Sequence, residues 1–103
     1  MIEINSPDDL RNHVLSAPLA LLDFWAPWCG PCRMMNPVLE RLQEQHPELV
    51  IAKVNVDENK PLAQTFGLRS IPTVVFFKDG EVKTTLVGAQ TLDKLQQVIA
   101  ALS

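Results

Sequence analysis

The stretch 19-LALLDFWAPWCGPCRMMNPVLERL-42 contains a strand, a short link with two cysteines and the start of a helix. Its first part, Leu19–Trp25, is a nearly continuous apolar run, which is typical of a strand covered on both faces. From Met35 onward, apolar residues recur at the i, i+3, i+4 and i+7 spacing of an amphipathic helix. We expect this helix to run from about Cys29 to about Gln45, with a kink at Pro37 because proline removes a backbone donor.

The rest of the chain alternates between strand and helix patterns. Further strands are predicted at 2–5, 49–56, 73–78 and 81–87, and further helices after Ser6, at 59–66 and after Thr91. Ser6 and Thr91 have the side chains of N-caps, Gly67 is suited to a C-terminal cap, and Asp79-Gly80 is typical of a hairpin turn. The order β-α-β-α-β-α-β-β-α predicts one α/β domain over residues 1–103, in which helices cover both faces of a mixed five-stranded sheet.

Composition excludes several classes of function. The chain has 103 residues, a formal charge of −3 and nine scattered basic residues, which is unlike a nucleic-acid-binding protein. The longest apolar stretch, Ala17–Trp28, is interrupted by Pro18, Asp23 and Pro27 and falls short of the roughly 20 residues of a membrane span. The N-terminal residues do not resemble a targeting segment. We therefore expect a cytoplasmic location with no membrane contact.

The two cysteines, Cys29 and Cys32, are three positions apart. A disulfide that closes so short a loop stabilises a fold poorly, but i and i+3 on one helical turn can form and break it with little backbone movement. At a helix N-terminus the thiolate of Cys29 is stabilised and its pKa lowered, whereas Cys32 is shielded. The spacing therefore favours redox chemistry. Half of a zinc site and an inert pair are the alternatives, although His13 and His46 do not have zinc-ligand spacing.

The segment Asp23–Cys32 resembles the active-site segment of the thioredoxin family. Four further matches follow in order along the chain: Lys53, Ile71-Pro72-Thr73, Lys78-Asp79-Gly80 and Val87-Gly88-Ala89. The resemblance covers essentially the whole chain and implies the thioredoxin fold, a sheet flanked by four helices. It also implies a general protein-disulfide reductase, a thiol–disulfide oxidoreductase that carries electrons.

The resemblance also assigns catalytic roles. Cys29 is expected to attack a client disulfide and Cys32 to resolve the mixed disulfide, so that the pair ends as the Cys29–Cys32 disulfide. Asp23 interrupts an apolar strand, where burial raises the pKa of a carboxyl group. The resemblance makes it the acid that exchanges a proton with Cys32 through water, with Lys53 nearby. A structurally hydrogen-bonded aspartate and a solvated lysine are the alternatives.

A docking surface for clients is implied as well. The family pattern predicts a cis peptide bond at Ile71–Pro72, against the general preference for trans and against the alternative of a plain turn proline. The main chain of Ile71 is then free to pair with an extended client segment. The expected docking rim has eight residues: Trp28, Gly30, Pro31, Ile71, Pro72, Val87, Gly88 and Ala89. Phe76, Phe77, Met34 and Met35 are interpreted as packing residues.

The resemblance implies partners too. We expect recycling by a thioredoxin reductase that is flavin-dependent and supplied by NADPH, client proteins with disulfides, no bound cofactor or metal, and a monomer. The Gly30-Pro31 dipeptide resembles reductases rather than thiol oxidants or isomerases of the same fold. A redox-independent subunit of a larger assembly is a further alternative. Pro27, Ser70 and Asn36 depart from the common family pattern, and Pro27 and Ser70 border the expected docking surface.

Overall fold

The computed structural model describes residues 1–103, and its elements follow the predicted order. The strands are β1 (Ile2–Glu3), β2 (Leu19–Trp25), β3 (Val50–Asn55), β4 (Thr73–Lys78) and β5 (Glu81–Val87). The helices are α1 (Pro7–Asp9), continued by the π-helical segment η1 (Leu10–Leu15), then α2 (Gly30–Gln45), α3 (Lys60–Thr65) and α4 (Leu92–Leu102). The α/β class with five strands and four helices is therefore confirmed. The sequence pattern did not indicate the π-helical continuation of the first helix.

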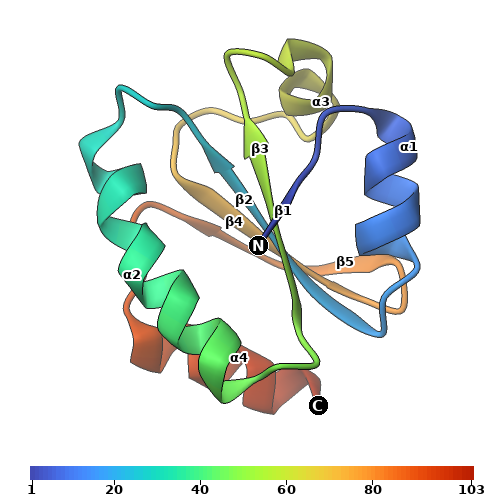
Figure 1. Cartoon of the computed structure of the whole chain (residues 1–103), viewed down its shortest axis with the longest axis vertical. Helices are drawn as coiled ribbons and strands as arrows, with labels where there is room; N and C mark the ends of the chain where they lie inside the picture. The colour runs from blue at the N-terminus through green and yellow to red at the C-terminus, as the bar shows by residue number, and fades with distance from the viewer.

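The five strands form one mixed sheet in the order β1-β3-β2-β4-β5 (Figure 1). β3 runs parallel to β1 and β2, whereas β4 runs antiparallel to β2 and β5. Because β2 and β3 are parallel, their carboxyl ends lie at the same edge of the sheet, where the link to α2 and the link to α3 begin. This edge places the cysteines beside residues that follow β3.

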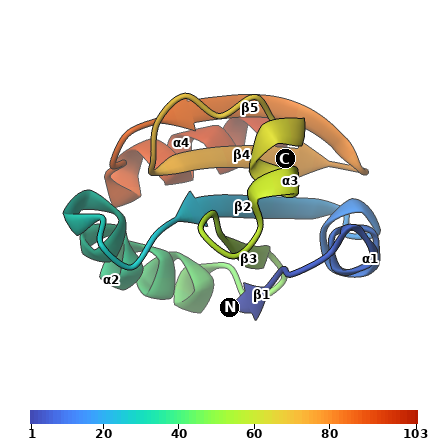
Figure 2. The ribbon, with the colours of Figure 1, turned by 90° about the horizontal axis from the view of Figure 1, so that it is seen from above.

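Helices cover both faces of the sheet: α2 and α4 lie on one face, α1 and α3 on the other (Figure 1), and Figure 2 shows the strands side by side from above. Alternate residues of β2 divide between the two cores, since successive strand side chains point to opposite faces. Leu21 belongs to the core under α2 and α4, and Leu22 to the core under α1 and α3. Asp23 and Trp25 are at odd positions like Leu21, and they therefore face the layer of α2.

The predicted caps and turns are present. The side chains of Ser6 and Thr91 each accept a hydrogen bond from the backbone N–H three residues on. Gly67 adopts φ +63° directly after α3, where backbone hydrogen bonds of the Schellman type end the helix. Asp79 and Gly80 both have positive φ, 52° and 81°, as a tight hairpin turn requires.

The predicted helix α2 is confirmed, with Pro37 inside it. Met35 is buried as predicted, but Met34 is 74% exposed, so the prediction that it packs in the core was wrong. Of the two methionines, only Met35 lies on the apolar stripe of the helix, because the side chain of Met34, one position away, points about 100° aside. No helix of the structure, α2 included, is both long and apolar enough to cross a membrane.

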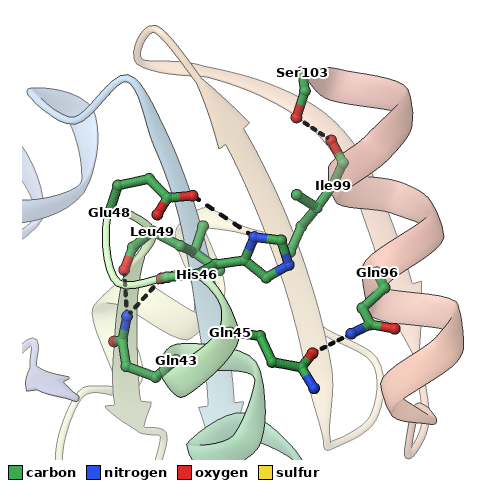
Figure 3. A network of polar contacts seen from close by, with 8 residues as sticks. All are labelled: Gln43, Gln45, His46, Glu48, Leu49, Gln96, Ile99 and Ser103. Atoms are coloured by element: carbon green, nitrogen blue, oxygen red, sulfur yellow. Dashed lines mark hydrogen bonds and ion pairs between the residues drawn. The ribbon is translucent and has the colours of Figure 1, made fainter.

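Side-chain amides fix the C-terminal end of α2 (Figure 3). The Nε2 of Gln43 donates to the carbonyl oxygens of His46, at 3.1 Å, and Leu49, at 2.8 Å, and so satisfies acceptors in the turn before β3. The Nε2 of Gln96 donates to Oε1 of Gln45, which joins α4 to α2. Only the Gln96–Gln45 contact links the two helices, at the end of α2 remote from the cysteines.

Candidate active site

Cys29 and Cys32 lie at the N-terminal end of α2. Cys29 is the N-cap residue, with extended backbone angles, and is joined to Cys32 by a disulfide across a Cα–Cα distance of 5.3 Å. The backbone N–H of Cys32 also donates a hydrogen bond to Sγ of Cys29, at 3.2 Å. An unpaired N–H and the positive end of the helix dipole stabilise negative charge, so this position suits the thiolate of a reduced Cys29.

Both sulfurs are well covered in the oxidised pair. Cys29 is 5% exposed and Cys32 is 1% exposed, so Cys29 is the more accessible of the two by a narrow margin. Trp25, Val56 and Ile71 pack against the small cluster of Ala26 and the two cysteines. Access to the pair from another protein therefore depends on the residues that pack around it.

Asp23 is completely buried on β2, facing the layer of α2. Neither of its carboxylate oxygens has a hydrogen-bond partner. Burial raises the pKa of Asp23 from 3.8 to about 6, although the positive charge of Lys53 acts to lower it. The alternative of a structurally hydrogen-bonded aspartate has no support in the structure. A carboxyl group with this pKa can gain or lose a proton near neutral pH.

Lys53 is the register partner of Asp23 on the neighbouring strand β3 and is only 8% exposed. It is therefore not the solvated lysine of the alternative interpretation. Its Nζ donates a hydrogen bond of 2.6 Å to Oδ1 of Asn36 on α2 and lies 4.6 Å from the ring centroid of Trp25. A neutral amide and an aromatic face thus stabilise its ammonium group.

Two loops form the other side of the site. The Ile71–Pro72 peptide bond is cis, and no backbone hydrogen bond outside the helices and strands involves Ile71. The N–H of Gly88 donates to the carbonyl oxygen of Pro72, at 2.8 Å, so the loop after β5 lies against the loop before β4. The amide of Gln90 donates to the carbonyls of Val87 and Gly88 and holds this second loop in shape.

The expected docking rim is partly exposed. Trp28 and Val87 are 68% and 64% exposed, Pro31 and Ala89 are exposed, and Gly30, Ile71 and Gly88 are half-buried. Pro72 itself is buried. Ile71 contacts the cysteine cluster directly, whereas the loop of Val87 and Ala89 is joined to the site through Pro72.

Sequence reasoning missed several residues around Trp28. Its Nε1 donates to Oδ2 of Asp57, at 2.9 Å, and it borders an open apolar groove of about 490 Å³. The lining of this groove comprises Trp28, Val56, Ala63, Leu68, Arg69, Ser70 and Ile71. Asp57 follows β3, and the parallel pairing of β2 with β3 was the available signal that it would lie near the cysteines.

The site contains no metal-binding cluster: nowhere in residues 1–103 do three or more His, Cys, Asp or Glu side chains lie together in a suitable arrangement.

A family model described as Thioredoxin matches residues 2–101. The chain belongs to the thioredoxin family. It is 45% identical to the thioredoxin of Bacillus subtilis (strain 168) over 100 residues, which cover 96% of each chain. It is 51% identical to Thioredoxin 1 of Synechococcus elongatus over 93 residues, or 82% of this chain and 87% of that protein.

Solved structures agree with this thioredoxin-family assignment. A mutant thioredoxin from Halobacterium salinarum superposes with a TM-score of 0.92 at 40% identity, covering 98% of this chain and 88% of that one. The thioredoxin of Fasciola hepatica superposes with a TM-score of 0.91 at 35% identity over all of both chains. The predicted thioredoxin fold is thereby confirmed. With its Cys29–Cys32 pair, the chain is a thiol–disulfide oxidoreductase that acts as a protein-disulfide reductase.

Proposed function

We propose that Cys29 is the attacking thiol and Cys32 the resolving thiol of this reductase. The Cys29 thiolate attacks one sulfur of a client disulfide; a Cys29–client bond forms, and the other client sulfur leaves as a thiolate and takes a proton. The Cys32 thiolate then attacks Sγ of Cys29, which forms the Cys29–Cys32 disulfide and releases the second client sulfur. The client gains two electrons and two protons. The N-cap position of Cys29, whose sulfur accepts the Cys32 N–H, carries this assignment.

Asp23 is the proton acceptor for Cys32 in this proposal, acting through a water molecule. Its carboxylate is buried under the layer of α2, has no hydrogen-bond partner and has a pKa of about 6, so it can accept a proton near neutral pH. Lys53 places a positive charge close enough to lower that pKa. Because Lys53 opposes the effect of burial, the carboxyl group of Asp23 can still lose its proton near neutral pH.

Client recognition is assigned to the docking rim. The unpaired main chain of Ile71 is suited to hydrogen-bond an extended client segment, as an added strand does at a sheet edge. The apolar rim residues around it would cover the reacting sulfurs, and the exposed indole of Trp28 offers the largest apolar surface. This rim comprises Trp28, Gly30, Pro31, Ile71, Pro72, Val87, Gly88 and Ala89. Main-chain hydrogen bonds and apolar contacts do not require one particular client sequence, so this rim suits many different clients.

The family also suggests how the chain is recycled. A thioredoxin reductase, flavin-dependent and supplied by NADPH, would return two electrons to the Cys29–Cys32 disulfide. The chain itself would need no bound cofactor and would act as a monomer in the cytoplasm.

A trapping experiment tests the two cysteine roles. In an insulin-reduction assay, Cys29→Ser should abolish turnover because the attacking sulfur is lost. Cys32→Ser should also stop turnover, but it should accumulate a mixed disulfide between Cys29 and the client, detectable by mass spectrometry under non-reducing conditions. The chain has only two cysteines, so the trapped bond can be assigned without ambiguity. Turnover that survives Cys29→Ser, or client adducts that accumulate on Cys32 in the Cys29→Ser variant, would contradict the assignment.

A further inference from the structure

We propose that Asn36 is a positioning residue: its amide oxygen holds the ammonium group of Lys53 away from the Asp23 carboxylate, which is thereby left free to exchange a proton. The inference rests on the proposed role of Asp23. It extends that role by adding a third residue, on a different element, to the pair of Asp23 and Lys53.

The starting observation is an ion pair that does not form. Asp23 and Lys53 are register partners on adjacent parallel strands, so their side chains leave the same face of the sheet. Both are buried, where attraction between opposite charges is strong. Nevertheless, none of the three ion pairs in the structure includes either residue, and both oxygens of Asp23 are unpartnered. Another contact must therefore determine where the ammonium group lies.

Asn36 supplies that contact. Its Oδ1 accepts a hydrogen bond of 2.6 Å from Nζ of Lys53, and it is the one hydrogen-bond partner of that ammonium. The indole of Trp25, at 4.6 Å, stabilises the same position of the charge. Asn36 lies four residues after Cys32, one turn along the same side of α2. The ammonium is thus drawn toward the helix that carries the thiols.

The position of the Lys53 ammonium group matters because of the groups that lie around the carboxyl group of Asp23. β3 contributes Lys53 to that face and β4 contributes the apolar register partner Val74, while α2, which covers this face, carries the two cysteines at its N-terminal end. Lys53 is therefore the one cation that can alter how readily Asp23 binds a proton. Its distance from the carboxylate, which Asn36 sets, determines by how much.

Two substitutions at Asn36 should act in opposite directions. Asn36→Ala removes the acceptor, so Lys53 can move toward the unpaired oxygens of Asp23 and should lower the pKa of that carboxyl by roughly one pH unit. Asn36→Asp keeps an acceptor for Lys53 and adds a negative charge, and should raise the pKa of Asp23. The measurement is an NMR titration of the Asp23 carboxyl carbon in the oxidised protein, in which the cysteines do not titrate.

Two controls make the test specific. Gln45→Ala removes an exposed amide from the far end of α2 and should leave the pKa of Asp23 unchanged. In a Lys53→Met background, Asn36→Ala should no longer shift the Asp23 pKa, because the ammonium group that it would release is absent. An Asp23 titration that is identical in wild type, Asn36→Ala and Asn36→Asp would overturn the proposal.

The rate at which Cys29–client mixed disulfides resolve, measured against pH, separates this inference from the proposed function. If the Asn36 variants shift both the pKa of Asp23 and the pH dependence of this rate, the inference about Asn36 and the proposed role of Asp23 are both supported. If they shift the pKa of Asp23 but leave the pH dependence of the rate unchanged, Asn36 still positions Lys53, whereas the role of Asp23 as proton acceptor for Cys32 fails.

Discussion

Asp23 and Lys53 occupy paired positions on β2 and β3, and yet the lysine bonds to Asn36 while the carboxylate has no partner. A buried carboxylate without a hydrogen bond or an ion pair destabilises the folded state. The ionised form of Asp23 therefore lowers the free energy of unfolding, at the position where the proposed mechanism needs a proton acceptor. This effect should be measurable as a dependence of stability on pH.

Asp23→Asn should change how stability depends on pH. The folded-state pKa is raised to about 6 from 3.8, so the stability that this carboxyl contributes is fully present below 3.8 and is lost as the pH rises through 6. A neutral asparagine does not undergo this loss. Between about pH 3.5 and about pH 8, the free energy of unfolding of the variant should therefore rise by about 3 kcal/mol relative to wild type, measured by urea denaturation.

Asp79→Asn, which replaces an exposed aspartate in the β4–β5 turn, is the matched control for the loss of a carboxyl group. If the difference in unfolding free energy between Asp23→Asn and wild type were the same at both pH values, the pKa of Asp23 would not be raised in the folded protein.

Trp28→Ala should weaken the binding of protein clients. Trp28 is 68% exposed beside the apolar groove, and a large exposed aromatic side chain at an interface is often a major contributor to affinity. We expect KM for insulin to rise about tenfold, which corresponds to about 1.4 kcal/mol, with a smaller change for a low-molecular-weight disulfide. The free energy of unfolding should fall by about 1 kcal/mol or less, because the side chain loses one exposed hydrogen bond, to Asp57.

Val82→Ala is the matched control, since Val82 is another exposed apolar side chain, at the opposite end of β5 from the site. An equal loss of insulin affinity in both variants would show that the groove beside Trp28 has no special part in recognition.

Gly80→Ala should destabilise the fold without changing the chemistry. Gly80 adopts φ +81°, and a Cβ there would lie 2.9 Å from the backbone oxygen of Leu15. Gly67 also has a positive φ, +63°, but a Cβ there would meet open space. We expect Gly67→Ala to lose about 1 kcal/mol of unfolding free energy and Gly80→Ala about 2 to 4 kcal/mol, measured by denaturant unfolding. Equal losses would mean that the hairpin turn moves away from Leu15 at little cost.

The sequence was sufficient for most of the fold because its local signals agree with one another. The apolar run of Leu19–Trp25 gave the central strand, Asp79-Gly80 gave the hairpin, and Thr91 gave the start of the last helix. Short elements were less accurate. β1 ends at Glu3 rather than near Asn5, and the segment Leu10–Leu15 is π-helical, because packing against the sheet decides such details and local propensity does not.

The candidate site was predictable where chemistry depends on neighbours in sequence, and less so where it depends on the fold. The spacing of Cys29 and Cys32 was sufficient to infer a redox pair. The contacts of Asn36 with Lys53 and of Asp57 with Trp28 join residues on different elements, and no local pattern indicates them. Their positions follow from strand register and helix rotation, which a single sequence specifies only indirectly.

The two loops that carry Pro72 and Gly88 lie at the base of one hairpin, where Thr73 pairs with Val87. The separation of these loops is therefore determined by the lengths of β4 and β5, six and seven residues, with an irregularity at Phe76/Phe77 that accommodates the difference. Inserting one residue into either strand would displace one loop by about 3.3 Å and reverse the alternation of side chains. Outward-facing side chains of β5 are free to vary, whereas the number of residues in each strand is not.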